Sequence, residues 1–426
     1  MSATILFVGH DAHRGGAEIA LLHILTWLRA ERLEQARVLL LGGGDLVPDY
    51  ERLAPTYRAA ELSRRAGLGR RVLRKLHLIP RPSRVPSALE RQRVDLVYLN
   101  TVAVAHLART LKTLWNVPIL LQLRELEMAI RFHCGTEELR AALEHIDGCV
   151  TGVQVAADLL MERYGLSPER IHRVPSGLTL PTRGAAWSPE ARRALRGELG
   201  IPAESFVVGG CGSPNWWKAP ELFVLAAHRL RLRHPQALVH FVWVGGHPQS
   251  LDHERLRHDV DRLGLGGMVR FLPTTPDPHR HFALFDAFLL TSREDTNPFV
   301  CIEAAALGLP VVCFGGSGGA PEFVEQDAGF IVPYLDFDAM AERLVLLMSD
   351  HGLRHRIGEQ AARKAKGRHA RERMGEGLGF VLDRYLPDRN HPAGTLANSD
   401  PNRRRLRAPN LADNGVRGET PSRLAQ

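Results

Sequence analysis

The segment from residue 285 to residue 319 constrains the fold more than any other part of the chain. It contains an apolar run at 285–290, a polar loop, an alanine-rich stretch, a second apolar run at 310–314 and a glycine loop at 315–319. Two short buried runs joined by one helical stretch are typical of parallel strands that are linked by a crossover helix. The segment therefore predicts an α/β fold with a parallel sheet.

Acidic side chains follow the first of these apolar runs. Glu294 and Asp295 lie in the loop after it, and Asn297-Pro298 has the composition of a helix start, with Asn as cap and Pro in the first helical position. Because helical side chains lean toward the N-terminus of their helix, we expect Glu303 to point back toward this loop. Carboxylates accept hydrogen bonds from hydroxyls, and a helix N-terminus beside a glycine loop attracts phosphate. This chemistry suits a sugar joined to a diphosphate.

Strand patterns alternate with helical patterns in two series, on either side of a Pro-, Gly- and Arg-rich linker at 178–205. The predicted strands are 5–8, 36–41, 96–99, 119–123 and 148–153 in the first series, and 206–210, 239–244, 269–272, 285–290 and 311–314 in the second. Such alternation predicts two doubly wound, Rossmann-like halves with parallel sheets, facing across a cleft. We expect domains at 1–180 and 181–369.

Composition narrows the class of protein. The chain has 426 residues and a net charge of +8, which favours anionic partners. No aromatic and basic motif accompanies this charge, so nucleic acid is not an expected partner. The five cysteines are scattered and have no zinc spacing, which indicates a reduced, cytoplasmic protein. No apolar run reaches the length of a membrane span.

Two basic segments lie outside the strand and helix series. The pattern at 64–79 is that of an amphipathic helix with Arg70, Arg71, Arg74 and Lys75 on its charged side. It predicts a peripheral contact with an anionic surface on the inner face of the membrane, although docking on the protein core explains the pattern equally well. Residues 387–426 have no apolar period, and we expect a disordered basic tail, either a solvated extension or an anion-binding arm.

The acidic loop and the glycine loop together resemble one enzyme family. Asp295 and Glu303 are separated by seven residues, as are the paired glutamates of the retaining glycosyltransferases of family 4, which have the GT-B fold. The runs Ser-Arg-Glu-Asp at 292–295 and Gly-Gly-Ala-Pro-Glu at 318–322 are similar to the bacterial branch that builds surface polysaccharides. The resemblance covers about residues 3–385. It implies an acceptor-side first domain, a nucleotide-sugar-binding second domain and a helix at 370–386 that returns to the first.

The resemblance also implies roles for residues of the second half. Asp295 and Glu294 would bind hydroxyls of the donor sugar, and Glu303 would hold the ribose hydroxyls of the nucleotide. Lys218, which follows the strand at 206–210, would reach the diphosphate leaving group. Asp295, Glu294 and Lys218 are therefore the expected catalytic residues, although a solvated surface lysine also explains Lys218.

The glycine loop would complete the diphosphate site through Ser317, Gly318 and Gly319. The family typically places an Arg a few residues before this lysine, or directly before it, and a Gly after it, whereas this chain has Ser213, Trp217 and Ala219 there. No Asp-x-Asp pattern follows a strand, so neither a metal nor a cofactor is expected, and the nucleotide-sugar is a substrate.

Two features of the first half match the same family. Gly15-Gly16 follows the first predicted strand, between His10-Asp11 and Glu18, and the resemblance places it near the donor phosphates and the acceptor. A plain strand-to-helix turn explains the glycine pair as well.

Arg124 stands where related chains carry a histidine. It would supply the positive charge that is missing beside Lys218, or bind an anionic acceptor. A structural salt bridge to Glu125 or Glu127 is the alternative.

The expected function is transfer of a hexose-type sugar, with retention of configuration, from a nucleotide-sugar to a saccharide or lipid-linked acceptor in cell-surface polysaccharide synthesis. A nucleotide-sugar epimerase on the same fold, and a catalytically impaired nucleotide-sugar-binding protein, are the alternatives. Product analysis with the donor alone separates the transferase from the epimerase.

Overall fold

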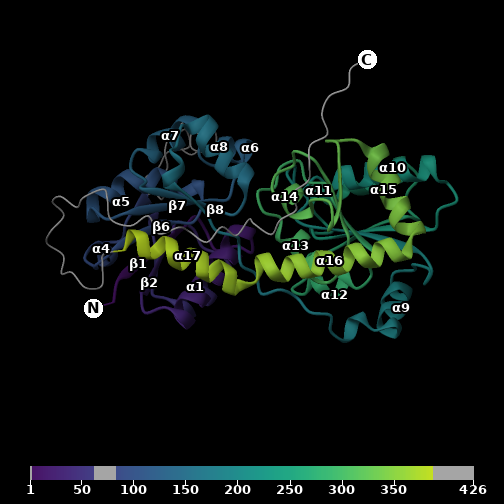
Figure 1. Ribbon diagram of the computed structural model, residues 1–426, viewed down its shortest axis with the longest axis horizontal. Coiled ribbons are helices and arrows are strands. Elements are labelled where there is room, and N and C mark those ends of the chain that lie inside the picture. Colours follow the sequence, from purple (N-terminus) through teal and green to yellow (C-terminus); the bar gives the residue numbers. More distant parts are fainter. Residues whose placement is uncertain (1, 62–82, 387–426) are drawn as a thin grey trace, which may run out of the picture. The chain divides into compact units, whose positions relative to one another are not determined.

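The computed structural model describes residues 2–61 and 83–386 (Figure 1). The helix predicted at 64–79 and the tail predicted at 387–426 lie outside these ranges, so both stay predictions. Over the described ranges, none of the helices has the length and apolar character needed to cross a membrane.

The first sheet has seven parallel strands in the order β3-β2-β1-β6-β7-β8-β9. In chain order these strands are β1 (Thr4–Gly9), β2 (Gln35–Leu40), β3 (Thr56–Arg58), β6 (Leu96–Leu99), β7 (Ile119–Leu123), β8 (Gly148–Thr151) and β9 (Ile171–Arg173). A short antiparallel pair, β4 (Ala60–Glu61) and β5 (Ser83–Arg84), lies outside the sheet. The helices of this half are α1 (Gly16–Glu31), α2 (Val47–Leu53), α4 (Ser87–Glu90), α5 (Ala108–Trp115), α6 (Glu127–His133), α7 (Thr136–Leu143) and α8 (Gln154–Tyr164).

The second sheet has six parallel strands in the order β12-β11-β10-β13-β14-β15. They are β10 (Phe206–Cys211), β11 (Val239–Val244), β12 (Val269–Leu272), β13 (Ala287–Leu290), β14 (Val311–Phe314) and β15 (Gly329–Val332). The helices around them are α9 (Pro189–Glu198), α10 (Pro220–Arg233), α11 (Leu251–Arg262), α12 (Pro278–Phe282), α13 (Phe299–Ala306), α14 (Ala320–Val324), α15 (Phe337–Ser349) and α16 (His351–His369).

These two sheets confirm the predicted fold class. Every strand predicted from the sequence overlaps a strand of the structure, because buried parallel strands form continuous apolar runs. Four apolar clusters fill the space between the sheets and the helices that cover them, two for each sheet. The domain boundaries at 180 and 369 stay predictions.

The last described helix, α17 (Arg371–Tyr385), packs in the core of the first half, although it follows α16 of the second (Figure 1). Met374, Leu378 and Leu382 of α17 share an apolar cluster with Trp27 of α1. Gly375 permits this close approach, because a Cβ atom at this position would overlap the Trp27 indole.

The chain therefore passes between the halves twice, and the two connections touch. The backbone N–H of Leu178 donates to the carbonyl of His369 at 2.9 Å. His369 is 8% exposed, its Nδ1 lies 3.3 Å from the Ser176 carbonyl, and its ring packs against Phe323. Burial lowers the pKa of this imidazole to about 4.

This pKa predicts how stability depends on pH. An unfolded histidine titrates near pH 6.5, so between pH 6.5 and about 4 the unfolded chain binds a proton that the native His369 does not. The free energy of unfolding should therefore fall with decreasing pH in this window, by on the order of 3 kcal/mol from this residue. Urea unfolding at several pH values should show a shallower dependence for His369→Gln. His355→Gln, on the exposed face of the same helix, should behave as the wild type; equal slopes in all three proteins would contradict the assignment.

Candidate functional site

Two loops of the second half are joined through their backbones where the sequence predicts the donor site. The N–H of Asp295, in the loop after β13, donates to the Ser317 carbonyl at 2.8 Å, and the N–H of Gly319 donates to the Asp295 carbonyl at 3.0 Å. Gly318 lies between these bonds with φ +121°, and a Cβ atom there would overlap the Asp295 carbonyl. Only glycine fits this conformation and this contact.

Ser317 anchors the glycine loop to its own strand. Its hydroxyl is buried and donates to the Phe314 carbonyl at 2.8 Å. The Ser317 hydroxyl is therefore already bonded within the loop. A ligand would contact the backbone N–H groups of this loop before it contacts the hydroxyl. The predicted diphosphate role of Ser317, Gly318 and Gly319 stays a prediction.

Lys218 and Asp295 form an ion pair, so the structure brings together two of the residues predicted to be catalytic. The lysine lies in the loop after β10, where the Asn215 side chain accepts its backbone N–H at 3.0 Å. Both side chains keep some exposure, 27% for Lys218 and 11% for Asp295. The lysine is therefore not an unattached surface cation in this structure.

Glu303 lies in α13 and pairs with a histidine that the sequence analysis did not select. Its Oε2 atom is 3.3 Å from Nε2 of His279, on the short helix α12, which Asp277 caps by accepting the Arg280 N–H at 3.3 Å. The helix start at Asp277-Pro278, which follows strand 269–272 after the short loop 273–276, was the available signal for this residue. Carboxylates of the predicted site therefore each have a cationic or polar partner.

The prediction that Asn297 caps α13 is wrong. The helix begins at Phe299, Pro298 takes the extended conformation of the capping position, and no side chain caps the helix. The Asn297 Nδ2 atom is buried, lacks a hydrogen-bond partner among the described residues and lies against Gly152 of the first half. Because its position is set by contact with the other half, local sequence could not reveal it.

Glu294 makes its contacts with the first half rather than beside Asp295. Its two carboxylate oxygens accept the backbone N–H groups of Met128 at 3.0 Å and Ala129 at 2.9 Å, in the first turn of α6. The capping residue of α6, Leu126, has no side-chain acceptor, so the glutamate satisfies helix N–H groups that would otherwise lack partners. The predicted role in sugar binding stays a prediction; in this conformation the carboxylate caps a helix.

A second glutamate makes the same kind of contact. Glu322 of α14 accepts the N–H of Gln154, at the start of α8, at 2.6 Å and pairs with Arg173. The capping residue of α8 is Val153, which also lacks an acceptor. Two carboxylates of the second half thus cap two helices of the first half.

Aromatic residues add to this contact. Trp217 packs edge-on against Phe132 of α6, with ring centroids 5.3 Å apart. The Arg293 guanidinium lies 5.4 Å from the Trp216 ring and pairs with Glu221. Both tryptophans therefore pack against protein groups.

Gly15 is the capping residue of α1, and the acidic residue of the first turn, Glu18, is buried. Glu18 Oε1 lies 3.3 Å from His10 Nδ1, and the other nitrogen of this ring lies 3.5 Å from Asp11. Burial raises the pKa of Glu18, and the neighbouring His10 opposes this shift. Gly15 has little space for a side chain, since a Cβ atom would overlap the Glu18 carboxylate, whereas Gly16 has open space.

The side chains of His10, Asp11 and Glu18 offer ligand atoms that lie within 4.8 Å of one another. The expectation that no metal takes part stays untested.

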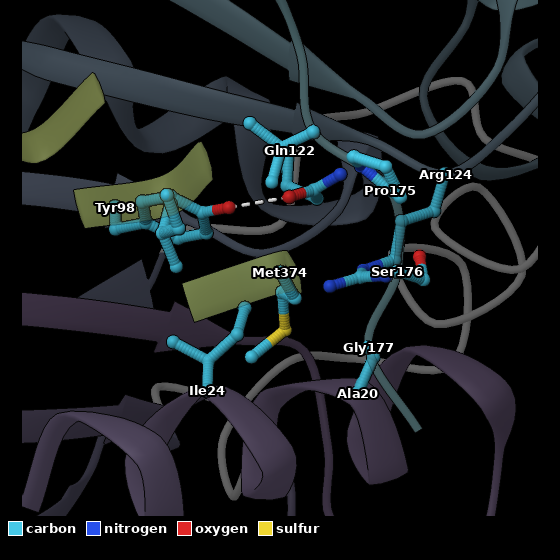
Figure 2. A pocket seen from close by; sticks show the side chains of 11 residues that line it. Ala20, Ile24, Tyr98, Gln122, Arg124, Pro175, Ser176, Gly177 and Met374 are labelled. Atoms are coloured by element: carbon cyan, nitrogen blue, oxygen red, sulfur yellow. Dashed lines mark hydrogen bonds between the residues drawn. The ribbon is translucent and has the colours of Figure 1, made fainter. Parts of the chain in front are cut away.

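Arg124 lies in the first half, beside a small cavity under β6 and β7 (Figure 2). Its Nε donates to the Asn100 carbonyl at 3.1 Å, and its Nη2 donates to the Asn100 side chain at 3.2 Å. Burial lowers the pKa of the guanidinium. Figure 2 also shows Tyr98, whose hydroxyl donates to Gln122. The cavity holds about 10 Å³, which is room for about one water molecule.

Neither expected salt-bridge partner of Arg124 is bonded to its guanidinium. Glu125 accepts the backbone N–H of Arg124 at 2.9 Å and a hydrogen bond from Thr101, and burial raises the pKa of its carboxyl. Glu127 pairs with Arg131 and Arg163. Both proposed roles in binding an anion therefore stay predictions for Arg124.

A family comparison covers the second half of the chain. Residues 191–364 match the family model of the glycosyl transferases group 1. This part of the chain is therefore similar to the group 1 glycosyl transferases. It includes Lys218, His279, Asp295, Glu303 and the glycine loop.

Curated relatives of the chain are D-inositol 3-phosphate glycosyltransferases. The protein of this name from Salinispora arenicola is 31% identical over 227 residues, which is 51% of each chain. That from Corynebacterium glutamicum is 27% identical over 295 residues, 65% of this chain and 69% of the relative. The first of these alignments thus spans about half the length of the curated relative.

Solved structures share the fold of both halves of the chain. The Anabaena protein HepE, crystallised in complex with UDP, is 23% identical, with a TM-score of 0.71 over 90% of this chain and all of its own. Sucrose-phosphate synthase from Thermosynechococcus elongatus is 17% identical, with a TM-score of 0.72 over 90% of this chain and 98% of its own. These likenesses confirm the GT-B fold.

The contact between Gly318 and the Asp295 carbonyl predicts that one added methyl group at residue 318 lowers the free energy of unfolding strongly. Gly316→Ala should cost about 1 to 2 kcal/mol of unfolding free energy, because φ is +73° there but no atom blocks a Cβ. Gly318→Ala should cost more, because its Cβ also overlaps the Asp295 carbonyl and must separate the two loops. Urea unfolding of both variants measures the difference; equal losses would show that the loops are not joined as described.

Proposed function

We propose that this protein is a retaining glycosyltransferase. It transfers a sugar from a nucleotide-sugar to a saccharide or lipid-linked acceptor in cell-surface polysaccharide synthesis, at the inner face of the membrane. The observation that carries the proposal is the pairing of Lys218 with Asp295 next to the Asp295–Gly318 backbone bridge. A cation, a carboxylate and the start of α13 thus lie together within residues 191–364, which match the family model, and this supports the proposal.

The donor would replace contacts that the side chains now make with each other. A diphosphate beside Lys218 competes with Asp295 for the ammonium group, and the released carboxylate is then able to accept hydrogen bonds from sugar hydroxyls. Glu303, whose side chain is 20% exposed, would accept hydrogen bonds from the ribose hydroxyls, and His279 lies beside it. The N–H groups of the glycine loop would face the phosphate.

The proposed reaction is the one that the resemblance to retaining glycosyltransferases implies. The acceptor hydroxyl oxygen forms a bond to the anomeric carbon on the face from which the phosphate oxygen leaves, and the departing phosphate takes the hydroxyl proton. Lys218 and the helix N-terminus would stabilise the charge that develops on the leaving diphosphate, which is the largest expected contribution to the rate. No additional base is required.

A phosphorylated polyol is the second candidate acceptor. The names of the curated relatives, D-inositol 3-phosphate glycosyltransferases, favour it. Arg124 and the nearby His10–Glu18 pair lie in the half that would hold the acceptor, and a buried guanidinium suits an acceptor phosphate. A membrane contact through 64–79 would instead favour a lipid-linked acceptor.

A screen of nucleotide-sugars by thermal shift selects the donor, because a bound ligand stabilises the native state by mass action. A donor that is consumed without any acceptor would favour the epimerase. A donor that binds and is never consumed with either acceptor class would favour the impaired binding protein.

Two substitutions separate the nucleotide contacts from the sugar contacts. Glu303→Ala should weaken nucleoside diphosphate binding by about 1.5 to 3 kcal/mol, because it removes a charged acceptor from the ribose. Asp295→Asn should reduce turnover while sparing nucleoside diphosphate binding. Calorimetry and initial rates measure both effects, with the exposed Glu342→Ala as the matched control. Unchanged nucleotide affinity in a folded Glu303→Ala protein would overturn the ribose assignment, and equal losses of binding and turnover in Asp295→Asn would overturn the sugar assignment.

A further inference from the structure

A hollow of about 670 Å³ lies at the edge of the second sheet that is opposite to the predicted donor loops. Its walls come from α9, from the starts of β10 and α16, and from Asp286, directly before β13. Lys218, Asp295 and the glycine loop instead follow the carboxyl ends of β10, β13 and β14. Since β10 has six residues, roughly 20 Å of strand separates the two edges. The volume is typical of a small-molecule site.

Positive charge exceeds negative charge in this hollow. Arg192 and Arg196, one helical turn apart on α9, both bind Asp286, each with an Nη2 atom 2.8 Å from one carboxylate oxygen. One carboxylate therefore serves two guanidinium groups. The other acidic residue of the lining, Glu204, is exposed.

A third guanidinium, that of Arg354 on α16, lies in the same lining, and no carboxylate of the described residues is bonded to it. It lies 5.4 Å from the Phe206 ring, donates to the Leu347 carbonyl at 3.0 Å and contacts the ring of His351 at 2.8 Å. Burial lowers the pKa of Arg354, while the charge of Asp286 opposes this shift and that of Arg192 adds to it. Arg354 is thus attracted by the Asp286 carboxylate, which already forms ion pairs with two other arginines, Arg192 and Arg196.

Buried polar atoms of the lining also lack partners. Arg196 is 4% exposed and Ser205 is 2% exposed, yet the Arg196 Nε–H and the Ser205 hydroxyl have no hydrogen-bond partner among residues 2–61 and 83–386. The Nε of Arg192 is in the same state. Buried donors of this kind are normally satisfied, so these unpaired donors and the excess positive charge favour an anion, which reaches the covered atoms once the side chains around them shift.

We propose that this hollow binds the phosphate group of a small phosphorylated molecule, at a site separate from the donor site. The guanidinium of Arg354 would meet the phosphate oxygens, and the Ser205 hydroxyl would donate to one of them. Arginine suits this task because its planar N–H groups match two phosphate oxygens at once. Trp187, which also lines the hollow, offers a flat apolar wall to the remainder of the ligand.

Calorimetric titration with inorganic pyrophosphate tests the site in the full chain. Because pyrophosphate is also a ligand for the predicted donor site, the titration is carried out on Lys218→Gln as well as on the wild type. Binding in the hollow should persist in Lys218→Gln and weaken about tenfold when Arg354→Gln is added. Arg343→Gln is the matched control, since Arg343 also lies over an aromatic ring, 5.2 Å from that of Phe330, outside the hollow.

Two further variants test the proposed site in case Arg354→Gln does not fold. Arg354→Lys retains the charge without the planar fork and should bind with intermediate affinity, and Ser205→Ala removes a hydroxyl that has no protein partner. Thermal unfolding without ligand shows which variants are folded. Binding that disappears in Lys218→Gln and is unchanged in folded Arg354→Gln and Ser205→Ala would overturn the proposal, while leaving the donor site intact. If Arg343→Gln weakens pyrophosphate binding as much as Arg354→Gln does, the affinity depends only on the net charge of the protein. That result would also overturn the proposed site.

Discussion

The backbone bridge between Asp295 and Gly318 is the contact on which the rest of the predicted donor site depends. It fixes the loop after β13 against the loop after β14 with two hydrogen bonds. Asp295 is thereby held where Lys218, from a third loop, reaches its carboxylate. Because the three loops follow neighbouring strands of one parallel sheet, their meeting is a consequence of the strand order β10-β13-β14.

Neighbouring residues of the same loop connect the second half to the first. Glu294 caps α6, Asn297 lies against Gly152, and Glu322 caps α8 a short distance along the chain. Helices α6 and α8 have no cap of their own, so the first half lacks hydrogen-bond partners that the second half supplies. These contacts between the halves come from residues 294–322, the same part of the chain that carries Asp295, Glu303 and the glycine loop.

Sequence alone predicted the parts of the fold that depend on local pattern. Buried strands such as β1 and β11 are continuous apolar runs. The strands β3 and β9 were not predicted, because Thr56–Arg58 and Ile171–Arg173 have only three residues each. The strand β15, Gly329–Val332, was also missed, although its run is as long as that of β6. The Lys218–Asp295 pair agrees with the expectation that both residues face one site.

The remainder of the candidate site depends on contacts between residues distant in the chain. Glu294 and Asp295 were both expected to face the donor sugar. Glu294 instead accepts hydrogen bonds from N–H groups at the start of α6, in the other half. His279 meets Glu303 only because α12 and α13 pack together, and Arg124 bonds to Asn100 of a neighbouring strand end. Spacing within one segment carries no information about such partners.

The anomeric configuration of the product tests the central claim most directly. The protein is incubated with the nucleotide-sugar that the screen selects and with each candidate acceptor, and the one-bond carbon–hydrogen coupling at the new linkage is measured by NMR. A retaining transfer releases the nucleoside diphosphate and gives a product with the same anomeric configuration as the donor, which is the expected result. A product of inverted configuration would contradict the same-face reaction.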